Sequence, residues 1–163
     1  DAVSVLGAQL LDEDLCGDAT QALLSIRDGV APYFRSALKK ASGRTRAPLI
    51  QALGMLQDTD SSATLRKALV DEDRGVRHMA AWSLANIGDA ASAELLMKAA
   101  DAAQGWERIE MIKVCLLMAD GLAATKQRAP AIQIYSHLRD TLNGSNERHF
   151  RETVEKALTA LTR

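Results

Sequence analysis

Apolar and polar positions follow one order three times along the first hundred residues of this chain. Each copy reads Leu, two further residues, an aliphatic residue, one residue and Asp, and its leucines are Leu23, Leu53 and Leu84, spaced 30 and 31 residues apart. Self-similarity at this period is typical of stacked repeats, in which each unit buries its apolar face only against its neighbours. We therefore predict a repeat architecture.

The spacing inside each copy is helical. Phe34, Leu65 and Leu96 follow the three leucines at a common step of 31, and apolar residues recur around them at i, i+3 and i+4, which is one face of an α-helix. Strict alternation is absent, so we predict an all-α chain of antiparallel helix pairs joined by tight turns. The expected helices span about residues 2–11, 14–26, 32–40, 45–56, 61–70, 75–87, 90–102, 106–125, 128–142 and 146–161.

A chain of 163 residues is expected to form one domain. Because it starts at Asp1 and not at Met, we expect a fragment or processed form of a larger protein, with the cytoplasm as the default compartment. The single repeat domain, residues 1–163, is divided into a lone first helix at 1–11, repeats at 12–42, 43–72 and 73–103, a longer divergent hairpin at 104–143 and a terminal helix at 144–163.

One repeat carries a family resemblance. An Asp lies shortly before Val76-Arg77, Ala80-Ala81 follow one turn later, and Leu84-x-x-Ile87-Gly88-Asp89 forms the turn. This segment resembles the short bacterial HEAT-like repeat that also occurs in phycobilin lyases, and the resemblance extends over about residues 12–103. It implies a right-handed α-solenoid whose second helices line a concave face that commonly holds another macromolecule.

The fourth hairpin departs from this pattern. Its stretch 119–138, with Gly121, Ala131 and Tyr135, partly resembles a tetratricopeptide unit, although the usual Trp and closing Pro are absent. The resemblance preserves the helical hairpin and leaves its curvature open.

Charged turns alternate along the repeats. Two acidic triplets, residues 12–14 and 71–73, each precede a first helix, where carboxylates satisfy free N–H groups. They do not fit the calcium loop of an EF-hand, since Cys16 and Leu23 occupy the fifth and twelfth positions. Between them lies a basic turn with Lys39, Lys40, Arg44 and Arg46. We predict that stacked acidic and basic turns pair into a charge ladder.

The second helices carry a row of mostly basic residues opposite the predicted core. On a concave face they would contact a partner, which we expect to be another protein or a domain of the same polypeptide. The expected contact residues are Tyr33, Arg35, Arg66, Lys67, Met97 and Lys98.

Two alternatives remain open: a nucleic-acid-binding solenoid that uses the same row as a basic stripe, and a lyase-like tetrapyrrole chaperone. A net charge of −1 gives no overall attraction to nucleic acid or to an anionic membrane.

Features of an enzyme are nearly absent from the sequence. His78, His137 and His149 lie on different predicted helices, no HExxH motif occurs, and the isolated cysteines Cys16 and Cys115 are typical of small buried side chains. A catalytic His–Cys or Ser–His pair formed through space stays open. We predict a non-catalytic chain with no cofactor and no metal site.

Overall fold

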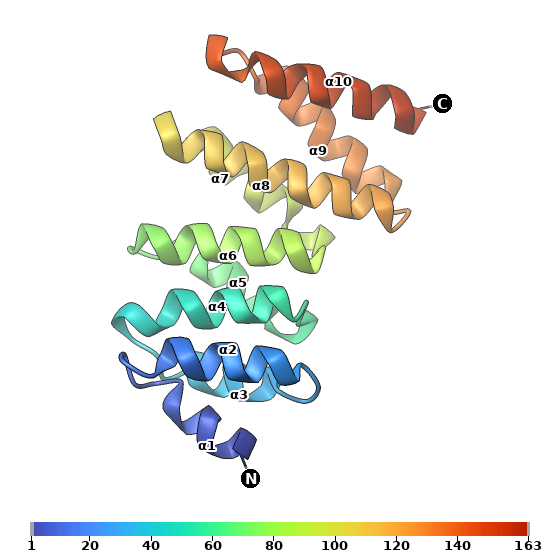
Figure 1. Cartoon of the computed structure of the whole chain (residues 1–163). Helices are drawn as coiled ribbons and strands as arrows, with labels where there is room; N and C mark the ends of the chain where they lie inside the picture. The colour runs from blue at the N-terminus through green and yellow to red at the C-terminus, as the bar shows by residue number, and fades with distance from the viewer. Residues whose placement is uncertain (1, 163) are drawn as a thin grey trace. The chain divides into compact units, whose positions relative to one another are not determined.

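The chain folds into helices joined by short turns. The computed structural model describes residues 2–162, and no strand occurs in that range. A 3₁₀ turn precedes α4, α5, α7 and α10, at Gly43–Thr45, Thr59–Ser61, Ala90–Ser92 and Ser145–Glu147. The helices are α1 (Ala2–Gln9), α2 (Cys16–Ile26), α3 (Ala31–Leu38), α4 (Arg46–Met55), α5 (Ser62–Ala68), α6 (Arg74–Ile87), α7 (Ala93–Ala102), α8 (Gly105–Ala124), α9 (Arg128–Thr141) and α10 (Arg148–Thr162) (Figure 1). The predicted all-α solenoid of helix pairs is confirmed.

The chain forms two compact units. Unit 1 ends at Ile87 and holds α1 to α6, whereas unit 2 begins at Gly88 and holds α7 to α10. This boundary falls between the two helices of the repeat predicted at 73–103. The grouping of residues 1–163 into one domain stays a prediction, and each unit is described by itself.

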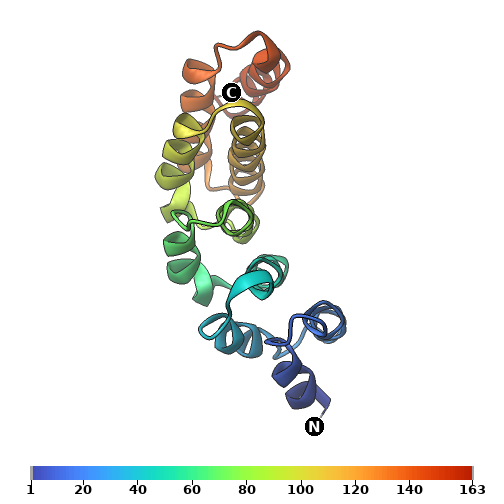
Figure 2. The ribbon, with the colours of Figure 1, turned by 90° about the vertical axis from the view of Figure 1, so that its left-hand side faces the viewer.

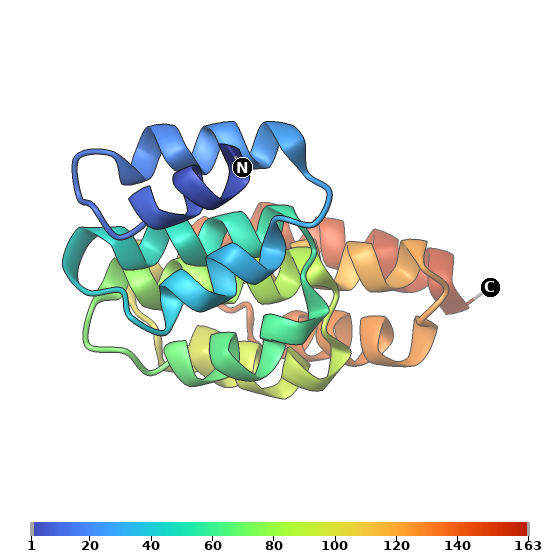
Figure 3. The same cartoon turned by 90° about the horizontal axis from the view of Figure 1, so that it is seen from below.

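Unit 1 has two layers of helices. The first helices α2, α4 and α6 pack side by side in one layer, and α3 and α5 lie in the other (Figure 2). Each second helix packs on the first helix that follows it, α3 on α4 and α5 on α6. In the same way α1 packs on α2, so α1 is a helix of the second type at one end of unit 1 (Figure 3).

The repeat positions found in the sequence form the core of unit 1. Leu23, Leu53 and Leu84 are fully buried, as are Phe34 and Leu65 on the second helices. Burying an aliphatic side chain of this size stabilises a fold by roughly 1.5–3 kcal/mol. Equivalent positions of successive repeats are thus buried in the same way. The helices of unit 1 therefore stack in a common register.

A close approach between α4 and α6 reinforces this register. A Cβ atom at Gly54 would lie 2.7 Å from the Cα of Ser83, well inside van der Waals contact. The Ser83 hydroxyl donates a hydrogen bond to the carbonyl of Ile50 at 2.9 Å, and the Asn86 amide donates to the carbonyl of Gly54 at 2.7 Å. Glycine at position 54 therefore permits a contact that a larger residue would obstruct.

Unit 2 continues the same hairpin plan with longer helices. α8 packs on both α7 and α9, and α10 packs on α9. Its core contains Ile112, Met118 and Leu122 on α8 and Ile134 and Leu138 on α9, all nearly or fully buried. The helix ranges predicted from periodicity are confirmed to within a few residues in both units.

Candidate functional site

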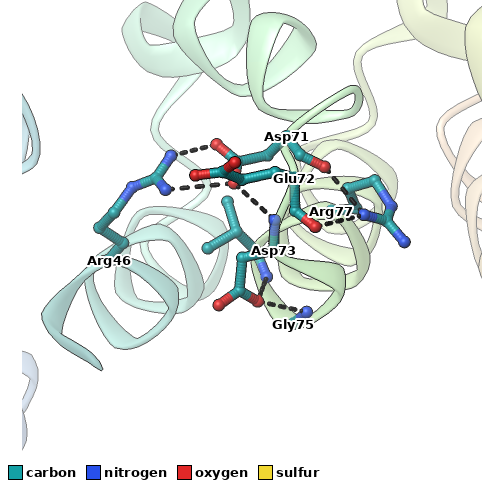
Figure 4. Close-up of polar contacts among 7 residues, drawn as sticks. Arg46, Asp71, Glu72, Asp73, Gly75 and Arg77 are labelled. Atoms are coloured by element: carbon teal, nitrogen blue, oxygen red, sulfur yellow. Dashed lines mark hydrogen bonds and ion pairs between the residues drawn. The ribbon is translucent and has the colours of Figure 1, made fainter. Parts of the chain in front are cut away.

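An arginine–aspartate pair links two successive hairpins of unit 1. Arg46, at the start of α4, donates to both carboxylate oxygens of Asp71, the first residue of the turn before α6 (Figure 4). The two side chains are 29% and 15% exposed, so water screens the pair less than a fully exposed one. The hydrogen bond from Arg46 lowers the pKa of Asp71 below its ordinary value.

The rest of this acidic turn binds the polypeptide itself. The Asp73 carboxylate accepts hydrogen bonds from the backbone N–H groups of Gly75 at 2.7 Å and Val76 at 3.1 Å, which caps α6. Arg77 donates to the carbonyls of Asp71 at 2.8 Å and Glu72 at 3.0 Å (Figure 4). The Asp73 carboxylate thus caps α6, as the capping interpretation predicted.

The other acidic triplet also forms contacts within unit 1, although α2 has no side-chain cap. Asp12 accepts hydrogen bonds from the N–H groups of Asp14 and Leu15, and Glu13 pairs with Arg44 at 2.7 Å. The hydrogen bond from Arg44 lowers the pKa of Glu13. Arg44 and Arg46 therefore form the predicted charge ladder. Lys39 and Lys40 do not, since both are exposed and neither forms an ion pair within the described residues.

Two of the predicted contact residues stabilise unit 1. Tyr33 is half-buried against α1, where a Cβ added to Gly7 would lie 2.5 Å from its ring. Arg35 forms ion pairs with Asp58 and with Asp60, at 3.2 Å, in the turn after α4. Both side chains therefore contact other parts of unit 1. The sequence pattern did not predict these contacts.

Met97 corrects the predicted row of contact residues. It is 5% exposed and belongs to the core of unit 2, so it cannot contact a partner from the folded surface. Arg35 on α3 and Arg66 on α5, which occupy the equivalent positions of the earlier repeats, are half-buried. A helix in a stack has neighbours on several sides, and an arginine there can extend its charged end to water while a methionine stays inside.

The lysines of the second helices remain exposed. Lys98 is exposed on α7 but pairs with Glu94 at 2.8 Å. In unit 1, α3 and α5 contain no acidic residue, and three exposed lysines lie at the C-terminal end of α3 and α5. We call these residues, Lys39, Lys40 and Lys67, the lysine surface. None of them forms an ion pair with a described residue.

In unit 2, one arginine connects three segments. Arg108 donates to the carboxylate of Glu147 at 2.6 Å, to the carbonyl of Ala100 at 3.0 Å and to that of Thr141 at 3.0 Å. Burial opposes ionisation of Glu147, but hydrogen bonds from Arg108 and from the Gly144 N–H outweigh it and lower the pKa of Glu147. This network holds the ends of α7 and α9 to the start of α10.

Unit 2 also brings a histidine, a carboxylate and a cysteine into one region. His137 lies 3.0 Å from the carboxylate of Asp101, and Cys115 lies on the intervening helix α8. Burial, with a smaller effect of Asp101, raises the pKa of the Cys115 thiol to about 12. A thiol that is 1% exposed and protonated at neutral pH is a poor nucleophile. The sequence left a His–Cys pair open, and His137 and Cys115 do not form a reactive one.

The described residues offer neither a metal site nor a membrane-spanning helix. Among residues 2–162, no group of three or more His, Cys, Asp and Glu side chains could hold a metal ion. No helix in that range is both long and apolar enough to span a membrane. A shallow open groove on α10 is lined by Glu152, Glu155, Lys156, Thr159 and Ala160.

Comparison with known protein families identifies the family of this chain. The family model for HEAT repeats matches residues 31–116, from α3 into α8, which is more than half of the chain. The chain therefore belongs to the HEAT-repeat family. Curated proteins gave no significant match to the sequence.

Proposed function

We propose that this protein is a non-catalytic scaffold that binds another protein through the lysine surface of unit 1. HEAT repeats commonly act as protein-interaction scaffolds. The observation that carries the proposal is the set of three exposed lysines, two directly after α3 and one on α5, that form no ion pair with a described residue. Lysines that form no ion pair within the described residues favour a partner segment of the opposite charge, so the expected ligand is an acidic stretch of a protein.

The ion pairs formed by the arginines of unit 1 support this choice of contact residues. Arg35, Arg44 and Arg46 are paired within unit 1, and Met97 is buried in unit 2. Of the six expected contact residues, the proposal keeps Lys67 and adds Lys39 and Lys40. Rigid helices hold these side chains in place before binding, which limits the entropy lost on association.

A protein ligand fits this surface better than a nucleic acid does. Sequence-independent binding of single strands combines basic grooves with exposed aromatic rings on which bases stack. In unit 1, Tyr33 is covered by α1, Phe34 is fully buried and Trp82 is half-buried. The lysine surface therefore lacks a neighbouring stacking platform among the described residues of unit 1.

Site-specific crosslinking in the producing cell tests the proposal. A photoreactive amino acid is placed at position 67 on α5 and, as a control on the first-helix layer, at the exposed position 51 on α4. We expect position 67 to give a discrete protein adduct that nuclease treatment does not remove, and position 51 to give none.

Charge reversal then tests the lysines. Lys39→Glu with Lys40→Glu should reduce the adduct yield at least about fivefold, and added salt should weaken it further. The matched control, Lys126→Glu with Lys156→Glu on exposed sites of unit 2, changes the net charge equally and should leave the yield unchanged. Equal adducts at positions 51 and 67, or an adduct that disappears with nuclease, would reject a protein partner at this surface.

A further inference from the structure

One asparagine of unit 2 lies in a sequence that favours a reaction of its own side chain. The chain has three asparagines, and of these only Asn143 is followed by glycine. Because Gly144 has no side chain, its backbone nitrogen is sterically open to the Asn143 amide. Asn143 is exposed, in the connection between α9 and the 3₁₀ turn before α10. Water therefore has access to the reacting groups.

The turn packs closely around this glycine. A Cβ added at Gly144 would lie 2.7 Å from Oδ1 of Asn146 and 3.2 Å from Cγ of Glu147. A larger residue, which would shield the backbone nitrogen, would therefore displace both of these side chains. The packing of the turn thus favours the residue that leaves Asn143 most open to attack.

The Glu147 carboxylate holds the nitrogen that would react. The Gly144 N–H donates to Oε2 of Glu147 at 2.9 Å, and Arg108 donates to Oε1 at 2.6 Å. Despite its burial, Glu147 has a pKa below the ordinary value, so the carboxylate is ionised at neutral pH. Removal of the Gly144 proton would create a second negative charge next to it, and like charges disfavour that step. The carboxylate therefore protects Asn143 from its neighbour.

Glu147 is poorly suited to the opposite role of a base. Efficient proton transfer requires a group whose pKa lies near the operating pH, and the pKa of Glu147 is lowered further from neutrality. Its second oxygen is also bound by Arg108. The hydrogen bond to Gly144 is thus expected to slow a reaction at this nitrogen and not to assist it.

We propose that Asn143 is a site of spontaneous deamidation and that Glu147 sets its rate by holding the Gly144 N–H. In the first step the Gly144 nitrogen bonds to Cγ of Asn143, the Cγ–Nδ2 bond breaks, and Nδ2 leaves as ammonia with the proton from Gly144. Water then opens the cyclic imide. Its hydroxyl joins one carbonyl carbon of the ring, the bond from that carbon to the ring nitrogen breaks, and the remaining hydrogen returns to the nitrogen. The product is aspartate or isoaspartate at position 143.

The product would loosen the start of α10. It carries a new carboxylate one residue from Gly144, whose N–H binds Glu147, and like charges this close repel. Glu147 and Arg108 join this turn to the carbonyls of Ala100 and Thr141, so a weakened Glu147 affects three segments of unit 2. This inference does not depend on the protein partner of the lysine surface, which belongs to unit 1.

Timed incubation at neutral pH, followed by mass spectrometry of proteolytic peptides, tests the proposal. The fraction with acid in place of amide at position 143 is measured in the folded protein and in a synthetic peptide of residues 139–148, which lacks the folded turn. We expect the folded protein to react at least about tenfold more slowly than the peptide. Glu147→Gln, which keeps the size of the side chain and removes its charge, should accelerate the folded protein about fivefold.

Two controls separate the local bond from general loss of structure. Asn86, which precedes Ile87 and not glycine, should stay unmodified in every sample. Leu122→Ala removes a buried side chain from α8 and lowers stability without a change in the turn. Its rate should stay close to that of wild type at a temperature where circular dichroism shows both proteins to be folded.

Four results would each overturn the proposal. They are equal rates in the folded protein and the peptide, no acceleration by Glu147→Gln, a slower reaction in Glu147→Gln, which would identify the carboxylate as a base, and equal acceleration by Leu122→Ala. The comparison with the peptide uses the unaltered chain, so it decides the matter even where Glu147→Gln fails to fold.

Discussion

At the scale of single residues, the turns after the first helices each contain a residue with a positive φ angle. Arg27, Gln57 and Lys126 have φ angles of 63°, 52° and 64°, and Gly88 has 75°. Each lies four residues after a buried leucine of a first helix. Backbone hydrogen bonds from Asp58 to the Leu53 carbonyl at 3.0 Å and from Gln127 to that of Leu122 at 2.8 Å close two of these turns. The turn after α8 thus has the same closing hydrogen bond as the turn after α4, whereas after α2 the Asp28 N–H donates to the Ile26 carbonyl.

Replacement of Lys126 by glycine should stabilise the protein. For a residue with a Cβ, the left-handed region of φ and ψ costs roughly 1–2 kcal/mol, whereas glycine adopts it without this cost. Lys126→Gly should therefore raise the free energy of unfolding by up to about 1 kcal/mol, as measured by urea denaturation. Lys156→Gly, on the exposed side of α10, should lower it by about 1 kcal/mol. Destabilisation by both variants would contradict the assigned turn conformation.

At the scale of helices and turns, charged residues join successive hairpins. The sequence predicted the pairing of acidic and basic turns, since equivalent turns of stacked repeats lie side by side. It could not show which basic residues take part, because Arg44 and Arg46 reach their partners while Lys39 and Lys40 do not. Whether a basic side chain pairs depends on its distance from the carboxylates of the neighbouring hairpin. The periodicity of the sequence does not give that distance.

The Arg46–Asp71 pair should make stability depend on pH. Its folded pKa lies below the ordinary value of an aspartate, about 4. The ionised carboxylate therefore stabilises the fold above about pH 4, and this contribution is lost as the pH falls through the folded pKa. Arg46→Met should lower the free energy of unfolding most near neutral pH, and the difference from wild type should shrink below pH 4.

Urea titrations between pH 2.5 and pH 7 measure this difference. Arg44→Met is the control, because its pair with Glu13 is more exposed and should contribute less at every pH. A difference between Arg46→Met and wild type that stays constant across the range would show that Asp71 does not depend on Arg46 for its low pKa.

At the scale of the whole molecule, the sequence predicted the architecture well and the surface less well. Buried leucines at a fixed step determined helices and stacking, because burial on a helix follows the 3.6-residue period. The helical period alone could not predict which side chains outside the core are exposed to solvent. Met97 was predicted beside the row opposite the core. Neighbouring helices of a stack also cover the flanks of a helix, and Met97 is buried. The partners of Tyr33 and Arg35 lie outside their own hairpin and left no periodic signal.

The most direct test concerns the claim that each hairpin depends on its neighbours in a stack. In such a fold, stability is close to a sum of local and nearest-neighbour contributions. Gly54→Val introduces a side chain where α4 meets α6, and overpacking of this kind costs roughly 1–3 kcal/mol. Native-state hydrogen exchange followed by mass spectrometry then reports the helix-by-helix response. Amide exchange should become about tenfold faster in α4 and α6 and stay unchanged in α9 and α10; equal acceleration in all helices would contradict a stack.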